Sequence, residues 1–220
     1  MDIFLRPTHV IDSDNKTIID TVEALTSSCK NNEEKAVKLF YFVRDQIHYS
    51  VYMLSTYLED FIASTVLARK KGYCVQKAVL LAALARAAHI PSRLAFARIK
   101  NHKAPKELIA QTGINVFPSH GYTQLFLNNR WVSVTPAFDK GLCRDISVPA
   151  VEFDGINDAL LPAHDLEGRP YIEYIEKYEP QADLPFEWLR GRLVPIWGEK
   201  HAWLEQGDSK GHRMPSGYVF

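Results

Sequence analysis

The sequence predicts an α+β fold in which a buried central helix packs on an antiparallel sheet. Apolar side chains occupy nearly every side of segment 75–88, and a helix that is apolar all round belongs in the protein interior. Two β-rich runs, 120–127 and 130–136, are joined by Asn128 and Asn129. Asparagine tolerates the positive φ that a two-residue hairpin turn requires, so these runs predict a β-hairpin.

The N-terminal part is expected to supply an extended arm and two helices. Residues 1–11 predict a short strand or extended arm. Segment 31–47 starts with an asparagine that can cap a helix and carries two acids in its first turn. Its apolar residues recur every three or four positions, which predicts a buried stripe: Ala36, Phe40, Val43 and Ile47. Segment 60–72 predicts a second helix, with Asp60 as a cap and Gly72 just past its end.

The central helix is followed by sheet-forming segments. Pro91 ends the helix, 93–99 predicts an apolar strand, and 100–119 predicts a long loop. With Asn128 and Asn129 as the hairpin loop, the register is fixed. Strand alternation then places seven side chains on one face: His120, Tyr122, Gln124, Phe126, Trp131, Ser133 and Thr135.

The pattern weakens after Asp139. Segments 171–178 and 184–205 are predicted to be helical, the second bent at Pro195, and 211–220 is predicted to be a loose tail. We expect a single domain overall, with residues 1–140 as the core, including the N-terminal helices, and residues 141–220 as an extension packed on it.

Composition favours a soluble cytoplasmic protein. Lysine plus arginine and aspartate plus glutamate both number 26, which argues against a nucleic-acid footprint over the whole surface. Three widely spaced cysteines fit a reducing compartment, without a zinc-ribbon or redox motif. No signal peptide or membrane-spanning segment is predicted.

Cys74 stands at the start of the central helix. Unpaired N–H groups and the macrodipole at a helix N-terminus favour an anion and lower the pKa of a thiol. The Cys74 backbone N–H would also face an oxyanion that forms at the atom the sulfur attacks. A thiol nucleophile needs a base, and His120 opens the hairpin that is expected to pack on this helix.

Three blocks of the sequence resemble the transglutaminase-like superfamily of cysteine acyltransferases and proteases. The first is Gly72-Tyr73-Cys74, followed by Leu84-Ala85-Arg86-Ala87-Ala88-His89-Ile90-Pro91-Ser92-Arg93. The second is His120-Gly121-Tyr122-Thr123-Gln124, and the third is Trp131-Val132-Ser133-Val134-Thr135-Pro136-Ala137. The resemblance covers roughly residues 35 to 140. It implies a papain-like, transglutaminase-like core, with Cys74 as nucleophile and His120 as general base.

The resemblance also implies an orienting aspartate, and here the sequence departs from the family. Thr135 stands where the aspartate is expected. Its hydroxyl can accept from the imidazole N–H but cannot stabilise an imidazolium as a carboxylate does. Asp139, the nearest acid, is slightly favoured for this role because a charged partner stabilises an imidazolium better, and Thr135 is the alternative. For the second oxyanion donor, Tyr49 and Tyr52 are candidates upstream of the cysteine.

These residues predict thiol-dependent acyl transfer on a peptide or small amide through a Cys74 thioester, with hydrolysis favoured over cross-linking. The alternative is a non-catalytic scaffold that binds peptides or proteins, with Cys74 as a packed thiol and His120 as an ordinary strand residue. No cofactor or metal is expected, because the acidic group around His164 matches no ligand spacing: Asp154, Asp158 and Asp165. No nucleic-acid or membrane partner is expected, and the oligomeric state is left open.

Overall fold

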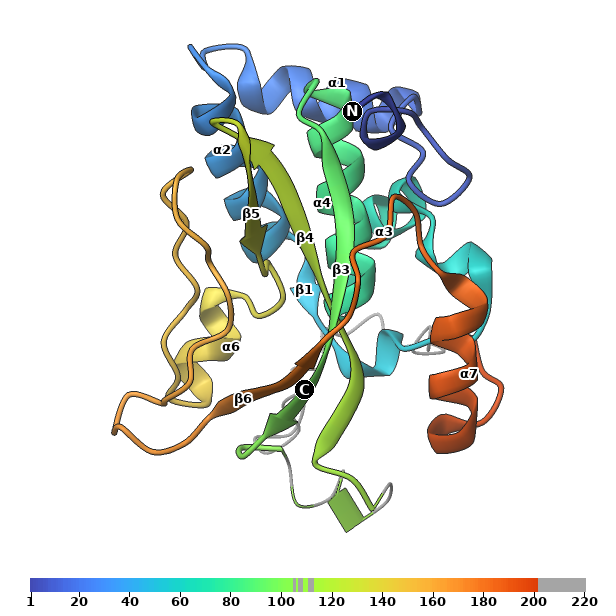
Figure 1. Ribbon diagram of the computed structural model, residues 1–220, viewed down its shortest axis with the longest axis vertical. Coiled ribbons are helices and arrows are strands. Elements are labelled where there is room, and N and C mark those ends of the chain that lie inside the picture. Colours follow the sequence, from blue (N-terminus) through green and yellow to red (C-terminus); the bar gives the residue numbers. More distant parts are fainter. Residues whose placement is uncertain (105, 107–108, 111–112, 202–220) are drawn as a thin grey trace, which may run out of the picture.

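The computed structural model describes residues 1–104, 106, 109–110 and 113–201 of the chain. Its centre is a four-stranded antiparallel sheet in the order β5-β4-β3-β6 (Figure 1). The strands are β3 (Ser92–Asn101), β4 (Val116–Leu127), β5 (Arg130–Val134) and β6 (Ile172–Lys177). A two-stranded parallel pair lies apart from this sheet and consists of β1 (His48–Tyr49) and β2 (Lys71–Gly72).

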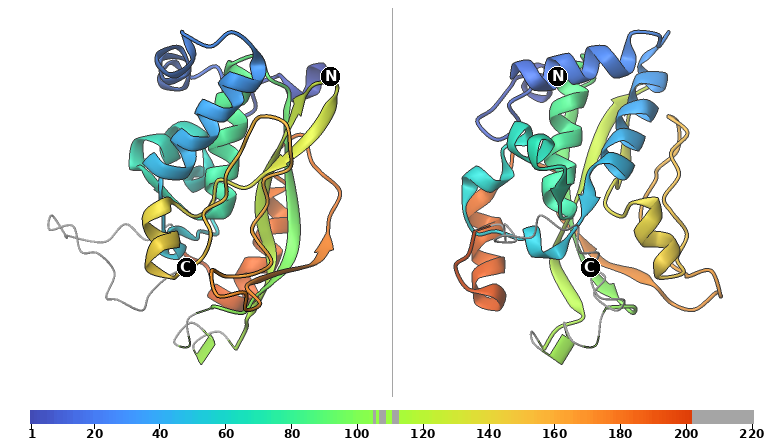
Figure 2. Two further views of the ribbon diagram at one scale, coloured as in Figure 1. Left: turned by 90° about the vertical axis from the view of Figure 1, so that its left-hand side faces the viewer. Right: turned by 180° about the vertical axis from the view of Figure 1, so that it is seen from behind.

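Helices cover one face of the sheet. The central helix α4 (Cys74–Ala87) lies directly on it, and Figure 2, seen from behind, shows α2 and α7 on opposite sides of α4. The other elements for which bounds can be given in the described residues are η1 (Asp2–Phe4), α1 (Lys16–Thr26), α2 (Asn32–Gln46), η2 (Val51–Met53), η3 (Leu58–Phe61), α3 (Ala63–Arg69), α6 (Lys140–Asp145) and α7 (Phe186–Trp197).

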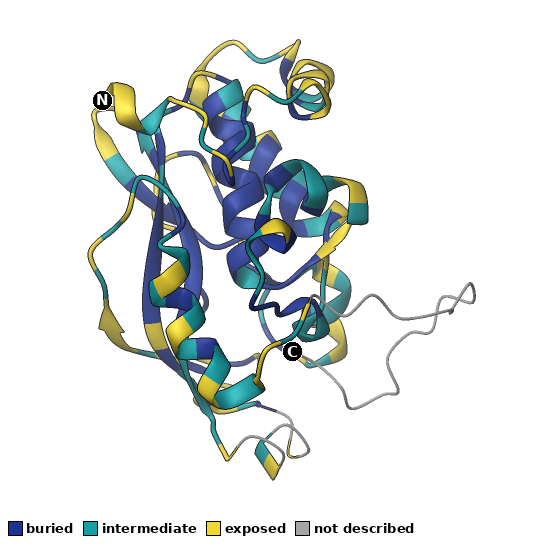
Figure 3. Ribbon diagram, turned by 90° about the vertical axis from the view of Figure 1, so that its right-hand side faces the viewer, coloured by how far each residue is buried: buried dark blue, intermediate teal, exposed yellow. Residues whose placement is uncertain are grey.

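The predicted α+β architecture is confirmed. Helix α4 is buried along almost its whole length (Figure 3), as its all-round apolar sequence requires. Helix α2 has the predicted Asn31 cap, whose side chain accepts from the Glu34 N–H. The four residues of its predicted stripe are fully buried: Ala36, Phe40, Val43 and Ile47.

The hairpin register is confirmed as well. Asn128 and Asn129 have φ values of 48° and 60°, as a two-residue turn of this type needs. Leu127 pairs with Arg130, and the ladder continues to Thr123 and Val134.

Several local expectations are wrong. Residues 2–4 form a short 3-10 helix within the predicted N-terminal arm. Helix α3 ends with Lys70 in the left-handed conformation, at φ 54°, so Gly72 is not its closing residue. Asp60 caps no helix, because its buried carboxylate forms an ion pair with Arg69 (2.7 Å).

The extension also differs from the expectation. Segment 171–178, predicted to be helical, contains the edge strand β6, which pairs with β3. Helix α6 was not predicted. The expected second helix is present as α7, with Pro195 inside it, whereas the predicted tail 211–220 lies outside the described residues.

Candidate active site

Cys74 is the first residue of α4, and a buried glutamine fixes the backbone that leads into it. Oε1 of Gln76 accepts the Tyr73 N–H (3.0 Å), and its Nε2 donates to the carbonyls of Met53 (3.0 Å) and Asp60 (2.9 Å). The side chain is fully buried, so the loss of any of these bonds would leave an unpaired polar group in the interior. The signal for this role was a glutamine three residues after a helix cap, as in a capping box.

The hairpin strand β4 packs closely on the first turn of α4. A Cβ at Gly121 would lie 2.9 Å from Cγ2 of Val75, so only glycine allows the two backbones to approach this far. Two residues further along β4, the Thr123 hydroxyl donates to the Ala78 carbonyl (2.9 Å). The strand that carries His120 is thereby fixed against the helix that carries Cys74.

His120 lies beside an irregularity in the sheet. The register between β3 and β4 shifts between the pairs Ala97–His120 and Ile99–Phe117. Such bulges re-aim side chains and often occur next to active sites. The imidazole is 4% exposed, and its ring lies 6.2 Å from the Tyr122 ring and 6.0 Å from the Tyr174 ring, measured between centroids.

Cys74 and His120 line the same cavity. The other walls come from α7, from the segment around β1 and η2, from the C-terminal end of β3 and from the N-terminal end of β4. Most of the wall residues are aromatic or aliphatic, including Tyr49, Tyr73, Ile99, Phe117, Leu193 and Trp197. The predicted nucleophile and base therefore share one largely apolar site.

Burial keeps both groups neutral. It raises the pKa of the Cys74 thiol to about 11, although the backbone N–H groups of Gly121, Val75 and Cys74 itself act in the opposite direction. Burial also lowers the pKa of His120 to about 4. The expected lowering of the thiol pKa at the helix N-terminus is thus outweighed by desolvation. The resting pair is a thiol and a neutral imidazole.

Thr135 lies just past the end of β5, one residue beyond the pair Thr123–Val134 that ends the ladder, and its N–H donates to the Ala159 carbonyl (2.8 Å). The side chain is fully buried. Nε2 of His120 is buried without a hydrogen-bond partner among the described residues. The Tyr174 hydroxyl lies next to Thr135 and accepts the Leu161 N–H (3.3 Å). Sequence reasoning missed Tyr174, which belongs to the strand predicted as a helix.

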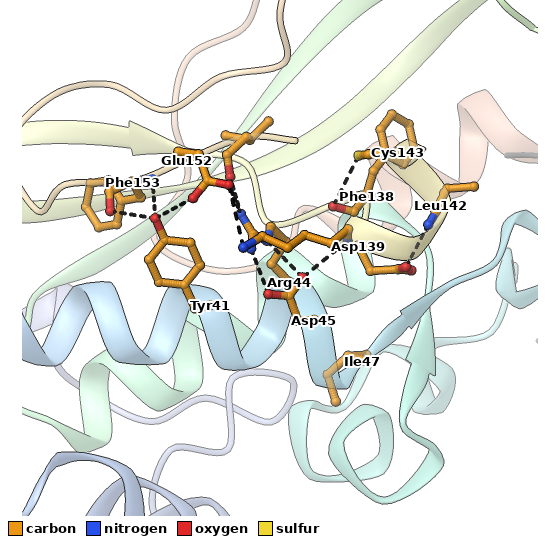
Figure 4. Close-up of polar contacts among 12 residues, drawn as sticks. Tyr41, Arg44, Asp45, Ile47, Phe138, Asp139, Leu142, Cys143, Glu152 and Phe153 are labelled. Atoms are coloured by element: carbon orange, nitrogen blue, oxygen red, sulfur yellow. Dashed lines mark hydrogen bonds and ion pairs between the residues drawn. The ribbon is translucent and has the colours of Figure 1, made fainter. Parts of the chain in front are cut away.

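Asp139 has a different set of partners. It is the N-cap of α6, where Oδ1 accepts the Leu142 N–H (3.0 Å), and Oδ2 accepts the Tyr49 N–H (3.2 Å). Figure 4 shows the carboxylate directed at Leu142. Neither oxygen bonds His120 within the described part of the chain. The identity of the third residue therefore stays a prediction.

Two tyrosines on the cavity wall are candidates for the second oxyanion donor. Tyr49 lines the cavity, and burial raises the pKa of its hydroxyl well above the usual value. Tyr73, which the sequence prediction did not include, also lines the cavity, and its buried hydroxyl has no partner among the described residues. Tyr52, the other predicted candidate, does not line this cavity.

The acidic residues around His164 serve local structure. Asp154 accepts the N–H groups of Ile156 and Asn157, Asp158 accepts the Ser133 N–H, and Asp165 binds Lys103 and Arg169. No cluster with metal-ligand character occurs among the described residues. Within the same residues, every helix is too short or too polar to cross a bilayer.

Comparison with known proteins agrees with the geometry. Residues 19–136, more than half of the chain, match the family model of the transglutaminase-like superfamily. No curated protein matches the sequence. Among solved structures, a candidate cysteine protease from Cytophaga hutchinsonii is 18% identical, with a TM-score of 0.50 over 83% of this chain. This likeness shows the fold, and the chain spans 48% of that protein's length.

Two further structures align over shorter stretches. A candidate protease from Parabacteroides distasonis is 15% identical, with a TM-score of 0.41, over 57% of this chain and 24% of its own. A TGase is 16% identical, with a TM-score of 0.36, over 56% of this chain and 31% of its own.

Proposed function

The chain belongs to the transglutaminase-like superfamily, and from this premise we propose that it is a cysteine enzyme that transfers the acyl group of an amide through a thioester on Cys74. One observation carries the proposal: Cys74 and His120 line one cavity, where the Gly121 N–H also reaches the sulfur. A nucleophile and a base on the wall of one site are the minimal set for covalent acyl transfer.

The neutral resting pair defines the first step. As the sulfur of Cys74 attacks the carbonyl carbon, His120 takes the thiol proton, and the carbonyl oxygen becomes an oxyanion. The Cys74 N–H and a tyrosine hydroxyl, from Tyr73 or Tyr49, stabilise this oxyanion. When the tetrahedral intermediate collapses, His120 returns the proton to the leaving amine and the thioester remains.

Hydrolysis completes the cycle. Water attacks the thioester carbonyl while His120 accepts its proton. The C–S bond breaks, the carboxylic acid leaves, and the thiol regains its proton. We favour water over an amine as acceptor because water is always present and no site for a protein amine is evident in the described residues. The substrate is a peptide or small amide.

For the orienting group, we propose Thr135 with Tyr174 ahead of Asp139. Thr135 directly follows β5, and its fully buried hydroxyl lies next to the hydroxyl of Tyr174. The Asp139 carboxylate already accepts two backbone N–H groups.

The proposal is tested by trapping the thioester. The protein is incubated with an activated acyl donor, and intact-mass spectrometry is used to find an adduct that Cys74→Ala lacks. We expect the adduct to decay in water and to be released faster by hydroxylamine, while a fluorescent primary amine competes poorly with water. No adduct with any donor would contradict the catalytic function.

A second candidate function is a non-catalytic scaffold that binds peptides. The neutral, buried thiol favours it, as does the lack of a carboxylate bonded to His120 within the described part of the chain. A scaffold would bind peptides equally well with Cys74→Ala and would form no adduct.

A further inference from the structure

The cavity beside Cys74 offers no charge to a substrate. Among the described residues that line it, none is an aspartate, glutamate, lysine or arginine. A charged group that entered would lose its hydration without gaining an ionic partner, which costs several kcal/mol. The walls therefore favour an uncharged, apolar group.

The cavity is also small. Its volume is about 60 Å³. An apolar cavity that binds benzene in another protein measures about 150 Å³. A short aliphatic group fits here, whereas an aromatic ring does not fit unless a wall moves.

One wall comes from the part of the chain that lies beyond the family match. Leu193, which is 4% exposed, and Trp197 reach the cavity from α7. The chain just after α7 is tied down: the Thr56 N–H donates to the Lys200 carbonyl (2.8 Å), and the Lys200 N–H donates to the Thr56 hydroxyl (2.8 Å). These bonds hold the end of α7, and with it Trp197, against the site.

We propose that this cavity is the acyl subsite of the enzyme and that it selects short, uncharged aliphatic acyl groups, with Leu193 and Trp197 setting the upper size limit. The inference rests on the proposed thioester chemistry and names its substrate class. It assigns a specificity role to α7, which the match over residues 19–136 does not include.

The test uses 4-nitrophenyl esters that share one leaving group and differ only in the acyl part: isobutyryl, phenylacetyl and succinyl. In the acylation step the C–S bond to Cys74 forms, the ester C–O bond breaks, 4-nitrophenolate leaves, and His120 takes the thiol proton. Spontaneous hydrolysis is subtracted with Cys74→Ala. We expect isobutyryl to acylate about ten-fold or more faster than either competitor. A single methylene too many in a hydrophobic pocket already costs about that factor, phenylacetyl exceeds isobutyryl by a ring, and succinyl brings a charge.

Enlarging the cavity should shift the acyl preference towards larger uncharged groups. Trp197→Ala should raise the rate for phenylacetyl relative to isobutyryl by about ten-fold and leave succinyl poor. If Trp197→Ala fails to fold, Leu193→Val takes its place. It is a smaller change that should also raise the phenylacetyl rate relative to the isobutyryl rate. Trp188→Ala is the matched control, because Trp188 lies on the same helix but packs on Phe96 and Tyr178.

The outcomes separate the two proposals. Acylation of Cys74 that does not discriminate among the donors, or a ratio that neither Trp197→Ala nor Leu193→Val changes, overturns the subsite and leaves the thioester chemistry standing. A complete absence of acylation with every donor contradicts the chemistry, and with it the subsite.

Discussion

Gly121 lies against Val75 so closely that a Cβ at position 121 would be 2.9 Å from Cγ2 of Val75 and 3.0 Å from its Cα. The contact joins the residue after the candidate base to the residue after the candidate nucleophile. The backbone atom cannot move aside as a flexible side chain can, so this glycine sets the distance between strand β4 and helix α4.

Gly121→Ala is therefore expected to cost about 1–3 kcal/mol of unfolding free energy, as overpacking typically does, and to lower acyl transfer further by separating His120 from Cys74. Urea unfolding and steady-state kinetics measure the two effects. Gly191→Ala is the control, because nothing lies within 4 Å of that Cβ and alanine favours a helix by about 0.5–1 kcal/mol. If both variants behave alike, Gly121 has no special role in the approach of the strand.

The reactivity of Cys74 should follow its raised pKa. With the pKa at about 11, the thiolate fraction grows about ten-fold per pH unit through neutral pH. The rate of alkylation by iodoacetamide should thus keep rising beyond pH 9. Mass spectrometry of the peptide that contains Cys74 separates it from Cys29, which is also a free thiol. A plateau already reached below pH 7 would indicate a thiolate–imidazolium pair and contradict the neutral resting state.

His120 should make the fold less stable in mild acid. Its folded pKa of about 4 lies below the unfolded value of about 6.5, so between these two pH values only the unfolded chain binds the proton. Stability is then fully present above pH 6.5 and falls as the pH drops towards 4, by at most about 3 kcal/mol.

Urea unfolding at pH 6.5 and 4.5 measures this loss. His120→Gln should reduce the difference between the two pH values. His89→Asn should leave it unchanged, because His89 is exposed and asparagine tolerates its positive φ of 62°. An unchanged difference in His120→Gln would show that other groups cause the acid sensitivity.

Much of the core could be predicted because its signals are local. The apolar run behind Cys74 predicted α4 to within one residue of its observed bounds. Asn128 and Asn129 fixed the hairpin register, since the turn itself determines which residues pair. These elements also carry Cys74 and His120, so the sequence alone could indicate the shared site.

The features that the sequence did not predict correctly depend on contacts between segments far apart in the chain. The apolar residues of segment 171–178 recur at helical spacing, and pairing with the free edge of β3 decides for the strand. Tyr174 reaches His120 only because of that pairing. The thiol pKa was predicted in the wrong direction because the helix terminus is visible in the sequence, whereas the degree of burial is not.

We expect Thr135 to be the group that orients His120. Nε2 of His120 is buried without a partner among the residues that the structure describes, and the buried Thr135 hydroxyl lies beside that of Tyr174. Thr135→Val should lower kcat about ten-fold or more with little change in KM, because an orienting bond strengthens as the imidazolium forms. Tyr174→Phe should have a smaller effect of the same kind.

Asp139→Asn is the matched comparison, since asparagine also caps helices well and preserves the start of α6. We expect it to keep nearly full activity and an unchanged pH profile. The opposite result, in which Asp139→Asn removes activity and Thr135→Val does not, would make Asp139 the orienting carboxylate. The turn after β5 would then have to bring Asp139 away from Leu142 and Tyr49 when substrate binds.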